Sequence, residues 1–335
     1  MIKIAINGFG RIGRNAFKIA LNRDDIEIVA LNDLTDTKTL AHLLKYDSTF
    51  GTYDRKVSHD DENVIVDGKK YRVLSIKDPA ELPWKDLGVD VVIESTGLFT
   101  DADKARAHIT AGAKKVVVSA AVKGDSTMIV LGVNDDKIAG AGEIVSNASC
   151  TTNCIAPIMA VLDREFGVTK AIMTTVHSYT SDQRLLDAPH KDLRRTRTAG
   201  TNIVPTSTNA SSAAAEVVPS LKGKFAGLSL RVPTPVVSIS DIVAVMKRNV
   251  TKEEINEALK KAAKDPYYQG ILDVTDDELV SGDFIGNSHS AIVDLALTDV
   301  VDGDLVKVVA WYDNEWGYSN RLVELTADVA KTLGA

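Results

Sequence analysis

Two side chains in this 335-residue chain have the types and positions needed to form a covalent bond to a substrate and to move its protons. Cys150 stands in the run SCTTNC, where a predicted strand gives way to a predicted helix. The dipole and the free N–H groups of a helix N-terminus lower the pKa of a thiol and favour the nucleophilic thiolate. His177 follows another predicted strand, where a functional loop begins, and an imidazole there is well placed to act as a base. We therefore predict that Cys150 is a nucleophile and His177 its base.

The second cysteine, Cys154, has a different expected role. It lies four residues after Cys150, on the same helical face and one turn deeper. A C-x₃-C pair without a second pair or an adjacent histidine lacks the spacing of a zinc site, so we expect no metal. Positions i and i+4 of a helix also have poor geometry for a disulfide. We expect Cys154 to be a small core residue.

A glycine-rich turn near the N-terminus predicts a dinucleotide site. Gly8, Gly10 and Gly13 form a G-x-G-x-x-G that follows a predicted strand and opens a predicted helix. In such a turn, the first glycine allows the tight bend, the second lets a pyrophosphate approach the backbone, and the third lets helix and strand pack closely. The helix N-terminus then faces the pyrophosphate. The alternative is a glycine-rich turn without a ligand.

Asp33 strengthens this interpretation and indicates which cofactor binds. It ends the second predicted strand, twenty residues after Gly13, where an acid accepts hydrogen bonds from the adenine ribose. A carboxylate there repels a 2′-phosphate, so we predict NAD in preference to NADP. The alternative role for Asp33 is to cap the next predicted helix.

A hydride acceptor beside a cysteine and a histidine favours a dehydrogenase over a cysteine protease. The combination predicts thiolate attack on an aldehyde to give a hemithioacetal. Hydride transfer to the nicotinamide then leaves a thioester, with His177 removing protons from the thiol and from the hemithioacetal oxygen.

Candidate anion-binding groups lie downstream of His177. Residues 190–197 read HKDLRRTR, the densest basic run in an acidic chain, and an arginine fork there would suit small phosphates. Arg231, at the end of a predicted strand, is a second candidate, and the hydroxyl-rich residues 206–209 would add neutral donors. A solvated basic face or an RNA-binding patch is the alternative for the basic run.

Hydrophobic periodicity predicts the elements that carry these groups. The first half alternates strands and helices, with a continuous apolar run at residues 89–94 that is typical of a buried parallel strand. This pattern predicts an open, doubly wound α/β sheet. We expect strands at residues 2–7, 26–31, 89–94, 115–119 and 128–131, and helices at 11–21, 37–45 and 101–111.

After residue 149 the pattern changes to long strands with few helices between them, which favours a mixed or antiparallel sheet. Residues 178–205 have no clear periodicity, and loops of that length are usually functional or disordered. We expect strands at residues 169–176, 228–232, 236–246, 291–297 and 306–311, and helices at 151–166, 252–264 and 319–332.

Composition limits the class of protein. The chain carries 39 Lys and Arg against 46 Asp and Glu, a net charge of −7. Non-specific binding to nucleic acid or to an acidic membrane surface would favour the opposite sign. Two cysteines fit a reducing compartment, and neither a signal peptide nor an apolar run of about 18–20 residues is recognisable. We expect a cytoplasmic protein without a membrane partner and without nucleic acid as its principal partner.

Several motifs together resemble the phosphorylating glyceraldehyde-3-phosphate dehydrogenase family over essentially the whole chain. They read INGFGRIGR, NASCTTNC, TTVHSYT, APHKDLRRTR, RVPTP and WYDNEWGYSNR. The resemblance implies an N-terminal Rossmann NAD-binding domain at residues 1–149 and an α+β catalytic domain at 150–314, with a C-terminal helix at 315–335 packing back on the first domain. It also implies a glycolytic homotetramer that oxidises glyceraldehyde 3-phosphate with NAD and inorganic phosphate to 1,3-bisphosphoglycerate.

The resemblance also assigns roles to individual positions. Cys150 and His177 match the nucleophile and its base. The cofactor positions are Gly8, Gly10, Arg11, Ile12, Asp33, Lys77, Thr96, Ser119, Asn314 (on the nicotinamide amide) and Tyr318 beside it. Thr180 and Arg231 match the site for the substrate's own phosphate. Ser149, Thr151, Arg195, Thr208 and Asn209 match the site for inorganic phosphate.

Two positions depart from the family pattern. Asn209 stands where the family usually has glycine, and asparagine tolerates positive φ better than most residues. Ala188 stands where many NAD-specific members carry leucine. The smaller alanine leaves room near the adenine ribose. The rival functions are erythrose-4-phosphate dehydrogenase, a close relative, and an RNA-binding protein on a dehydrogenase scaffold.

Overall fold

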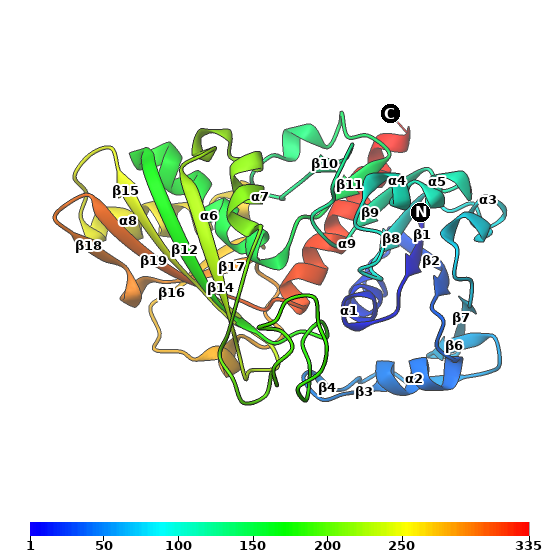
Figure 1. Ribbon diagram of the computed structural model, residues 1–335. Coiled ribbons are helices and arrows are strands. Elements are labelled where there is room, and N and C mark those ends of the chain that lie inside the picture. Colours follow the sequence, from blue (N-terminus) through cyan, green and yellow to red (C-terminus); the bar gives the residue numbers. More distant parts are fainter. Residues whose placement is uncertain (335) are drawn as a thin grey trace. The chain divides into compact units, whose positions relative to one another are not determined.

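The computed structural model describes residues 1–334, which form two compact units. The first unit contains residues 1–129, residues 135–148 and the C-terminal segment from Ser319. The second contains residues 130–134 and 149–318. Figure 1 labels most of the helices and strands of both units.

The first unit is built on a nine-stranded sheet with the order β10-β11-β9-β8-β1-β2-β7-β6-β5. The strands from β10 to β7 pair in parallel, and β7, β6 and β5 pair antiparallel. The strands are β1 (Ile2–Asn7), β2 (Ile26–Asn32), β5 (Val57–His59), β6 (Asn63–Val66), β7 (Lys69–Leu74), β8 (Val91–Glu94), β9 (Lys115–Val118), β10 (Thr127–Met128) and β11 (Ile144–Ser146); β3 (Tyr46–Asp47) and β4 (Gly51–Thr52) form a separate pair.

The helices of this unit follow the βα alternation. They are α1 (Arg11–Ala20), α2 (Thr37–Lys45), α3 (Trp84–Leu87), α4 (Ala102–Ala105) and α5 (Ala107–Thr110), with α9 (Trp316–Lys331) contributing the residues from Ser319 on. Helix α2 begins where Asp36 caps it, by accepting a hydrogen bond from the Thr39 amide at 2.9 Å. The parallel order with intervening helices confirms the predicted doubly wound sheet.

The second unit is built on a mixed eight-stranded sheet with the order β13-β14-β12-β15-β19-β17-β16, and β18 pairs with β19. Its strands are β12 (Val168–Ser178), β13 (Val204–Thr206), β14 (Phe225–Val232), β15 (Ser238–Met246), β16 (Leu272–Thr275), β17 (Ala291–Asp294), β18 (Asp299–Val301) and β19 (Leu305–Tyr312). Its own helices are α6 (Cys150–Phe166), α7 (Ala210–Val217) and α8 (Lys252–Ala263). The predicted α+β architecture is confirmed.

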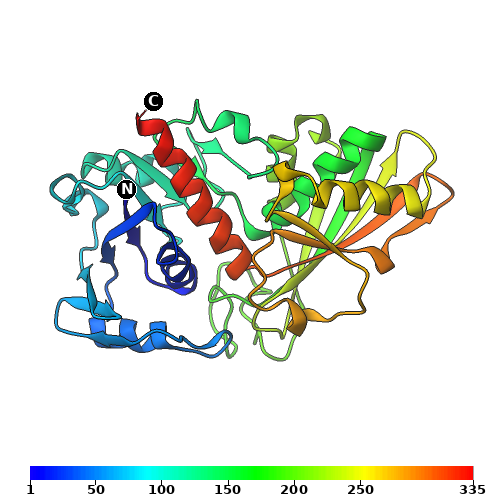
Figure 2. The ribbon, with the colours of Figure 1, turned by 180° about the vertical axis from the view of Figure 1, so that it is seen from behind.

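Helix α6 is the central helix of the second unit. It packs on α7 and α8 and on strands β12, β15, β17 and β19, and its apolar residues from Cys154 to Leu162 are almost all fully buried. Figure 2 shows α8, in yellow and orange, lying along the same unit from behind. This packing fixes the helix N-terminus, at which Cys150 stands.

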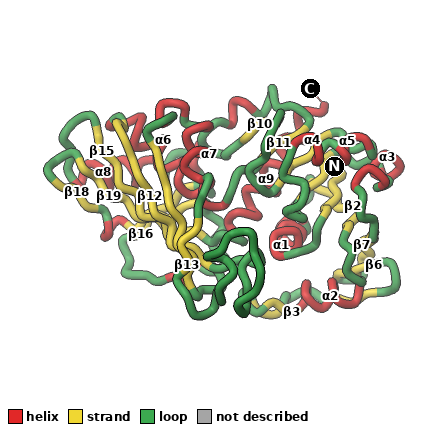
Figure 3. The backbone as a smooth tube through the Cα atoms, viewed as in Figure 1, coloured by secondary structure: helices red, strands yellow, loops and turns green. Residues whose placement is uncertain are grey.

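Some element boundaries differ from the prediction. The strand predicted at residues 291–297 ends at Asp294, because Leu295–Leu297 turn into a 3₁₀ helix. The helix predicted at residues 101–111 consists of two short helices that meet at Arg106. Strand β10 ends at Met128 and not at residue 131. The stretch without periodicity is a loop from the end of β12 to β13, drawn in green in Figure 3.

Candidate active site

The glycine turn after β1 has a backbone that side chains would disturb. Gly8 has a φ of +91°, and a Cβ on it would lie 2.7 Å from the Thr96 amide nitrogen. A Cβ on Gly13 would lie only 2.0 Å from the carbonyl oxygen of Gly8, so helix α1 packs directly on the turn. Gly10 has no atom within 4 Å of its Cβ position and faces open space.

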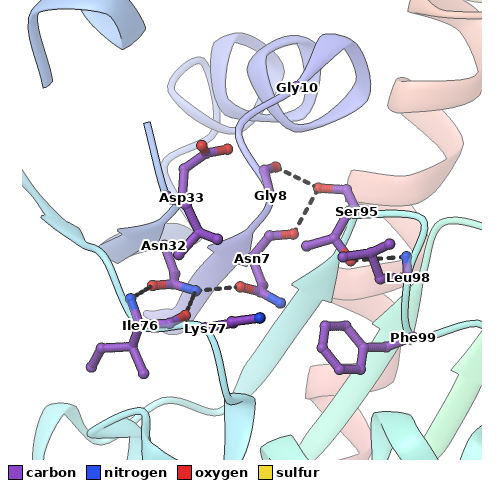
Figure 4. A pocket seen from close by; sticks show the side chains of 12 residues that line it. Asn7, Gly8, Gly10, Asn32, Asp33, Ile76, Lys77, Ser95, Leu98 and Phe99 are labelled. Atoms are coloured by element: carbon purple, nitrogen blue, oxygen red, sulfur yellow. Dashed lines mark hydrogen bonds between the residues drawn. The ribbon is translucent and has the colours of Figure 1, made fainter. Parts of the chain in front are cut away.

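This open space belongs to a cavity of about 330 Å³ at the carboxyl ends of β1, β2 and β8 (Figure 4). Ligands of doubly wound sheets bind at this edge. The cavity is lined by Asn7, Gly8, Gly10, Asn32, Asp33, Leu34, Ile76, Lys77, Ser95, Thr96, Leu98 and Phe99. Five of the predicted cofactor residues are among them: Gly8, Gly10, Asp33, Lys77 and Thr96.

Asp33 is held in place by the turn itself. Its Oδ2 accepts a hydrogen bond from the Phe9 amide at 2.8 Å, and its Oδ1 accepts one from the Thr35 amide at 3.0 Å. These two hydrogen bonds hold the carboxylate in a fixed position, and Asp33 is one of the cavity-lining residues drawn in Figure 4. One cavity is thus surrounded by glycine backbone, the N-terminus of α1 and a carboxylate. This combination is suited to binding a dinucleotide.

Three further predicted cofactor residues of this unit lie near or beyond the cavity. Arg11 and Ile12 form the first turn of α1, and the Arg11 guanidinium donates to Asp47 at 2.7 Å. Ser119 follows β9, outside the residues that line the cavity.

A buried polar network beneath the cavity was missed by the sequence analysis. The Glu94 carboxylate, 1% exposed, accepts hydrogen bonds from the Thr96 amide at 2.7 Å and from Asn7 Nδ2 at 2.5 Å. His108 Nε2 lies 3.0 Å from the same carboxylate, and Trp84 Nε1 donates to His108 Nδ1 at 3.0 Å. A glutamate closing the apolar run at residues 89–94 was the available signal, because a buried carboxylate needs partners.

In the second unit the structure places Cys150 beside His177. Cys150 begins α6, and Ser149 caps that helix by accepting a hydrogen bond from the Thr152 amide at 3.0 Å. His177 lies at the end of β12, with its Nε2 3.4 Å from Cys150 Sγ. The thiol is half-buried and the imidazole is fully buried. The distance suits proton transfer between sulfur and nitrogen, and the catalytic roles stay predictions.

The pKa of the thiol differs in direction from the sequence-based expectation. Burial raises the pKa of Cys150, and it outweighs the Arg231 charge and the Thr151 hydrogen bonds, which lower it. The expected lowering of the thiol pKa at the helix N-terminus is therefore wrong, because desolvation of the charged form is the larger effect. Burial and the Arg231 charge lower the pKa of His177 to about 3.

The other ring nitrogen of His177 has two neighbours. Nδ1 lies 2.7 Å from the carbonyl oxygen of Ser178 and 2.7 Å from Nη1 of Arg231. The same Nη1 lies 3.2 Å from the Ser178 oxygen. Arg231 comes from β14, whose register with β12 pairs Arg231 with His177. Two neighbouring parallel strands thus place the arginine next to the predicted base.

A chain of hydroxyl groups lies beside the predicted catalytic pair. The buried Tyr312 hydroxyl lies 2.9 Å from Thr151 Oγ1 and 2.8 Å from Thr175 Oγ1, and the Tyr312 ring packs edge-on against His177. Tyr312 was not predicted as a site residue. Its position in the run WYDNEWGYS, at the end of β19, was the available signal.

Asn314 and Tyr318, both predicted to contact the nicotinamide, lie in the second unit. The Oδ1 of Asn314 accepts hydrogen bonds from the Ser178 hydroxyl at 2.9 Å and from the Ser238 hydroxyl at 3.0 Å. These two donors fix the orientation of the amide, so that its NH₂ group points away from them. Tyr318 is buried, 5% exposed.

The predicted anion-binding residues fall into separate groups. Arg195 and Asn209 line a polar cavity of about 290 Å³ together with His190, Lys191, Asp192 and Ser207. Arg195 forms ion pairs with Asp182 and Asp192. Thr180 lines another cavity, of about 270 Å³, and Thr208 accepts a hydrogen bond from the Ala210 amide at 3.1 Å.

Asn209 needs no special backbone conformation. Its φ is −97°, so the positive φ for which glycine or asparagine is suited does not occur at this position. The departure from the family pattern therefore leaves the turn intact and places an amide side chain at the polar cavity.

Comparison with known proteins agrees with this geometry. Residues 2–102 match the family model for the NAD-binding domain of glyceraldehyde 3-phosphate dehydrogenase, and residues 149–314 match the model for its C-terminal domain. The chain is 55% identical over 334 residues to glyceraldehyde-3-phosphate dehydrogenase of Streptomyces coelicolor, covering 99% of both chains. It is 54% identical over 330 residues to that of Geobacillus stearothermophilus, covering 98% of both.

A doubly wound sheet with a dinucleotide cavity, joined in one chain to a unit in which a thiol faces an imidazole, defines an NAD-dependent oxidoreductase. The matches over nearly the whole chain narrow this class. The chain belongs to the glyceraldehyde 3-phosphate dehydrogenase family. The predictions of the family and of NAD as cofactor are confirmed, and the relatives do not favour erythrose-4-phosphate dehydrogenase. Within residues 1–334, no helix has the length and apolar character of a membrane span.

Proposed function

We propose that this chain is a phosphorylating aldehyde dehydrogenase of glycolysis, which oxidises D-glyceraldehyde 3-phosphate with NAD and inorganic phosphate to 1,3-bisphosphoglycerate. The 3.4 Å separation of Cys150 Sγ and His177 Nε2 carries the proposal, because it joins a nucleophile to a base in an NAD-dependent family. The matched relatives align with this chain over almost their full lengths, and they are named glyceraldehyde-3-phosphate dehydrogenase.

The reaction begins with His177 Nε2 accepting the thiol proton while Cys150 Sγ attacks the aldehyde carbon. The proton passes to the aldehyde oxygen, giving a hemithioacetal on Cys150. Bound NAD supplies the acceptor for the hydride that leaves this carbon. His177 takes the hydroxyl proton as the carbonyl forms, and the product is a thioester.

The thioester is then cleaved by phosphate. A phosphate oxygen attacks the thioester carbonyl, the carbon–sulfur bond breaks, and the Cys150 thiolate leaves and is reprotonated. We assign Ser149, Thr151, Arg195, Thr208 and Asn209 to this inorganic phosphate. Arg195 and Asn209, at one polar cavity, support the assignment. Thr180 and Arg231 are assigned to the phosphate of the substrate.

NAD would be held by several parts of the chain. Gly8, Gly10, Arg11 and Ile12 would receive the pyrophosphate at the start of α1, and Asp33 the adenine ribose. Lys77, Thr96 and Ser119 complete the predicted set in the first unit. Asn314 would bind the nicotinamide amide, with Tyr318 beside it.

We further propose a cytoplasmic homotetramer with functional domains at residues 1–149 and 150–314 and a C-terminal helix, residues 315–335, that packs on the first. Two cysteines that are both free suit a reducing compartment. The outer face of the second sheet supports self-assembly, since Ile172 is 58% exposed on β12 and Leu228 is 41% exposed on the adjacent β14. Apolar patches of this kind mark protein interfaces. Light scattering of the purified protein measures the assembly directly.

The activity is tested by steady-state rates with glyceraldehyde 3-phosphate or erythrose 4-phosphate, NAD or NADP, with and without phosphate. We expect the highest kcat/KM with glyceraldehyde 3-phosphate and NAD, and a rate that depends on phosphate or arsenate. A higher kcat/KM for erythrose 4-phosphate, or phosphate-independent oxidation, would refute the proposal. Salt-sensitive RNA binding without turnover would establish the RNA-binding alternative instead.

A further inference from the structure

The buried polar network beneath the dinucleotide cavity runs across the carboxyl ends of neighbouring strands. Asn7 ends β1, and the sheet register pairs it with Asn32 of β2 on one side and with Glu94 of β8 on the other. Asn32 Nδ2 donates to Asn7 Oδ1 at 2.7 Å, and Asn7 Nδ2 donates to Glu94 Oε2 at 2.5 Å. Asn32 also exchanges two hydrogen bonds with the backbone of Ile76, just after β7 (Figure 4). One relay of side chains therefore joins the ends of the four adjacent strands β8, β1, β2 and β7.

The direction of each hydrogen bond in this relay is fixed from its end at Ile76. The Ile76 amide can only donate, so the group that it meets at 3.0 Å is the Asn32 oxygen, and the Asn32 NH₂ group is left to donate. Asn7 must then accept from Asn32 through its oxygen and donate to Glu94 through its nitrogen. Neither amide can turn over without setting two donors against each other.

Trp84 and His108 fix the other side of Glu94 in the same way. The Trp84 indole N–H can only donate, and it lies 3.0 Å from His108 Nδ1. Nδ1 is therefore unprotonated, and the proton of the neutral ring is on Nε2, which donates to Glu94 Oε2 at 3.0 Å. Trp84 and His108 are both fully buried. A doubly protonated imidazole would set its Nδ1 proton against the indole proton, so Trp84 keeps His108 neutral.

Glu94 is the common acceptor of all these donors. Its Oε2 accepts from Asn7 and from His108, whose nitrogens lie 3.4 Å apart because they share this oxygen. Its Oε1 accepts from the Thr96 amide at 2.7 Å and from the Thr96 hydroxyl. A carboxylate offers about four acceptor positions, so the capacity of Glu94 is fully used. Asn7, Asn32 and Thr96 line the cavity, and Glu94 lies behind them.

We propose that Glu94 is a positioning residue for NAD, and that Trp84 and His108 hold it in the one hydrogen-bonded arrangement that fixes the cavity wall. The inference rests on the proposed function, in which NAD occupies the cavity of the first unit. The relay reaches the segments that follow β1, β2, β7 and β8, and Lys77 lies in one of them. A wall that is ordered before the ligand arrives pays less entropy on binding, so the affinity for the ligand is higher.

Glu94→Gln tests the acceptor directly. Glutamine keeps the size of the side chain, but its NH₂ group meets the donors of Asn7 and His108 or those of Thr96. We expect the Kd for NAD, measured by calorimetry well below the melting temperature, to rise at least about tenfold as the wall loses its fixed position. An unchanged Kd in the folded variant would overturn the proposal.

Glu143→Gln is the matched control for removal of a carboxylate. Glu143 belongs to the same unit, is half-exposed and pairs with Arg106 at the surface. Exposed ion pairs contribute little to stability, and Glu143 lies outside the residues that line the cavity. This variant should bind NAD as the wild type does. A Kd raised as much as in Glu94→Gln would contradict a specific role for Glu94.

Position 108 separates positioning from packing, and it keeps the inference testable if Glu94→Gln does not fold. In His108→Gln the amide nitrogen can donate to Glu94 and the amide oxygen can accept from Trp84, as the neutral imidazole does. In His108→Met, of similar length, both hydrogen bonds are lost. We expect His108→Gln to bind NAD within about twofold of the wild type and His108→Met to bind it at least about tenfold more weakly. Equal Kd values in the two folded variants would show that the residue only fills space.

Failure of the proposed function gives a different result from failure of this inference. Gly10→Ala reports on the placement of the pyrophosphate at the glycine turn, and normal NAD binding by that variant would refute the placement. Weak NAD binding by Gly10→Ala together with an unchanged Kd in Glu94→Gln would refute the positioning role of Glu94 alone.

Discussion

Replacement of Gly13 by alanine tests whether the turn after β1 is built on direct contact between helix and strand. The added Cβ would lie 2.0 Å from the Gly8 carbonyl oxygen and 3.0 Å from Ser95 Oγ. The first contact is with backbone, and Gly8 is itself closely packed against Thr96, so the turn has little room to move.

The magnitude follows from two opposing effects. Alanine in place of glycine within a helix stabilises by about 1 kcal/mol. Over-packing costs typically about 1–3 kcal/mol, and a clash with backbone belongs at the upper end. We expect a net loss of about 2 kcal/mol in the free energy of unfolding, which corresponds to a fall of roughly 4–8 °C in the melting temperature.

Gly10→Ala is the matched control, because its Cβ meets no atom within 4 Å. Its melting temperature in the absence of NAD should equal that of the wild type, whereas its Kd for NAD, measured by calorimetry, should rise at least about tenfold as the methyl group blocks the pyrophosphate. An unchanged melting temperature for Gly13→Ala, or normal NAD binding by Gly10→Ala, would refute the reasoning.

The remaining predictions concern the base, the phosphate site and the cofactor preference. His177→Asn should slow alkylation of Cys150 by iodoacetamide at pH 7 by about tenfold or more, since a neutral imidazole no longer accepts the thiol proton; an unchanged rate would remove His177 from its role. Arg195→Leu should raise the KM for inorganic phosphate about tenfold or more through the loss of charge-assisted hydrogen bonds, with the Kd for NAD unaltered; an unaltered phosphate KM would count against the assignment. The wild type should have a lower kcat/KM with NADP than with NAD, because Asp33 repels a 2′-phosphate; equal values would show that interpretation of Asp33 to be wrong.

Local patterns were sufficient for the elements that carry the predicted site. Helix α2 has the predicted limits, residues 37–45. An aspartate caps its N-terminus, and a regular apolar face marks its extent. Strands β1 and β12 and helix α6 were found within one or two residues at either end. The antiparallel strands between residues 46 and 74 were missed, because short strands with alternating exposure depend on partners that no local pattern specifies.

What sequence reasoning missed in the site depends on contacts between distant residues. The bond between Thr151 and Tyr312 spans 161 residues, and that between Asn7 and Glu94 spans 87. The direction of the Cys150 pKa shift was also wrong, because the helix N-terminus is visible in the sequence and the degree of burial is not. The position of Arg231 against His177 follows from the register of β12 and β14, which only the folded sheet defines.

The covalent intermediate on Cys150 is tested most directly by intact and peptide mass spectrometry. The enzyme is mixed with NAD and glyceraldehyde 3-phosphate in phosphate-free buffer, quenched in acid within the first turnover and digested. We predict that one acyl group is attached to the peptide containing Cys150, that it disappears when phosphate is added before the quench, and that Cys150→Ser carries none. An enzyme that forms NADH under these conditions without an adduct on Cys150 would contradict the mechanism.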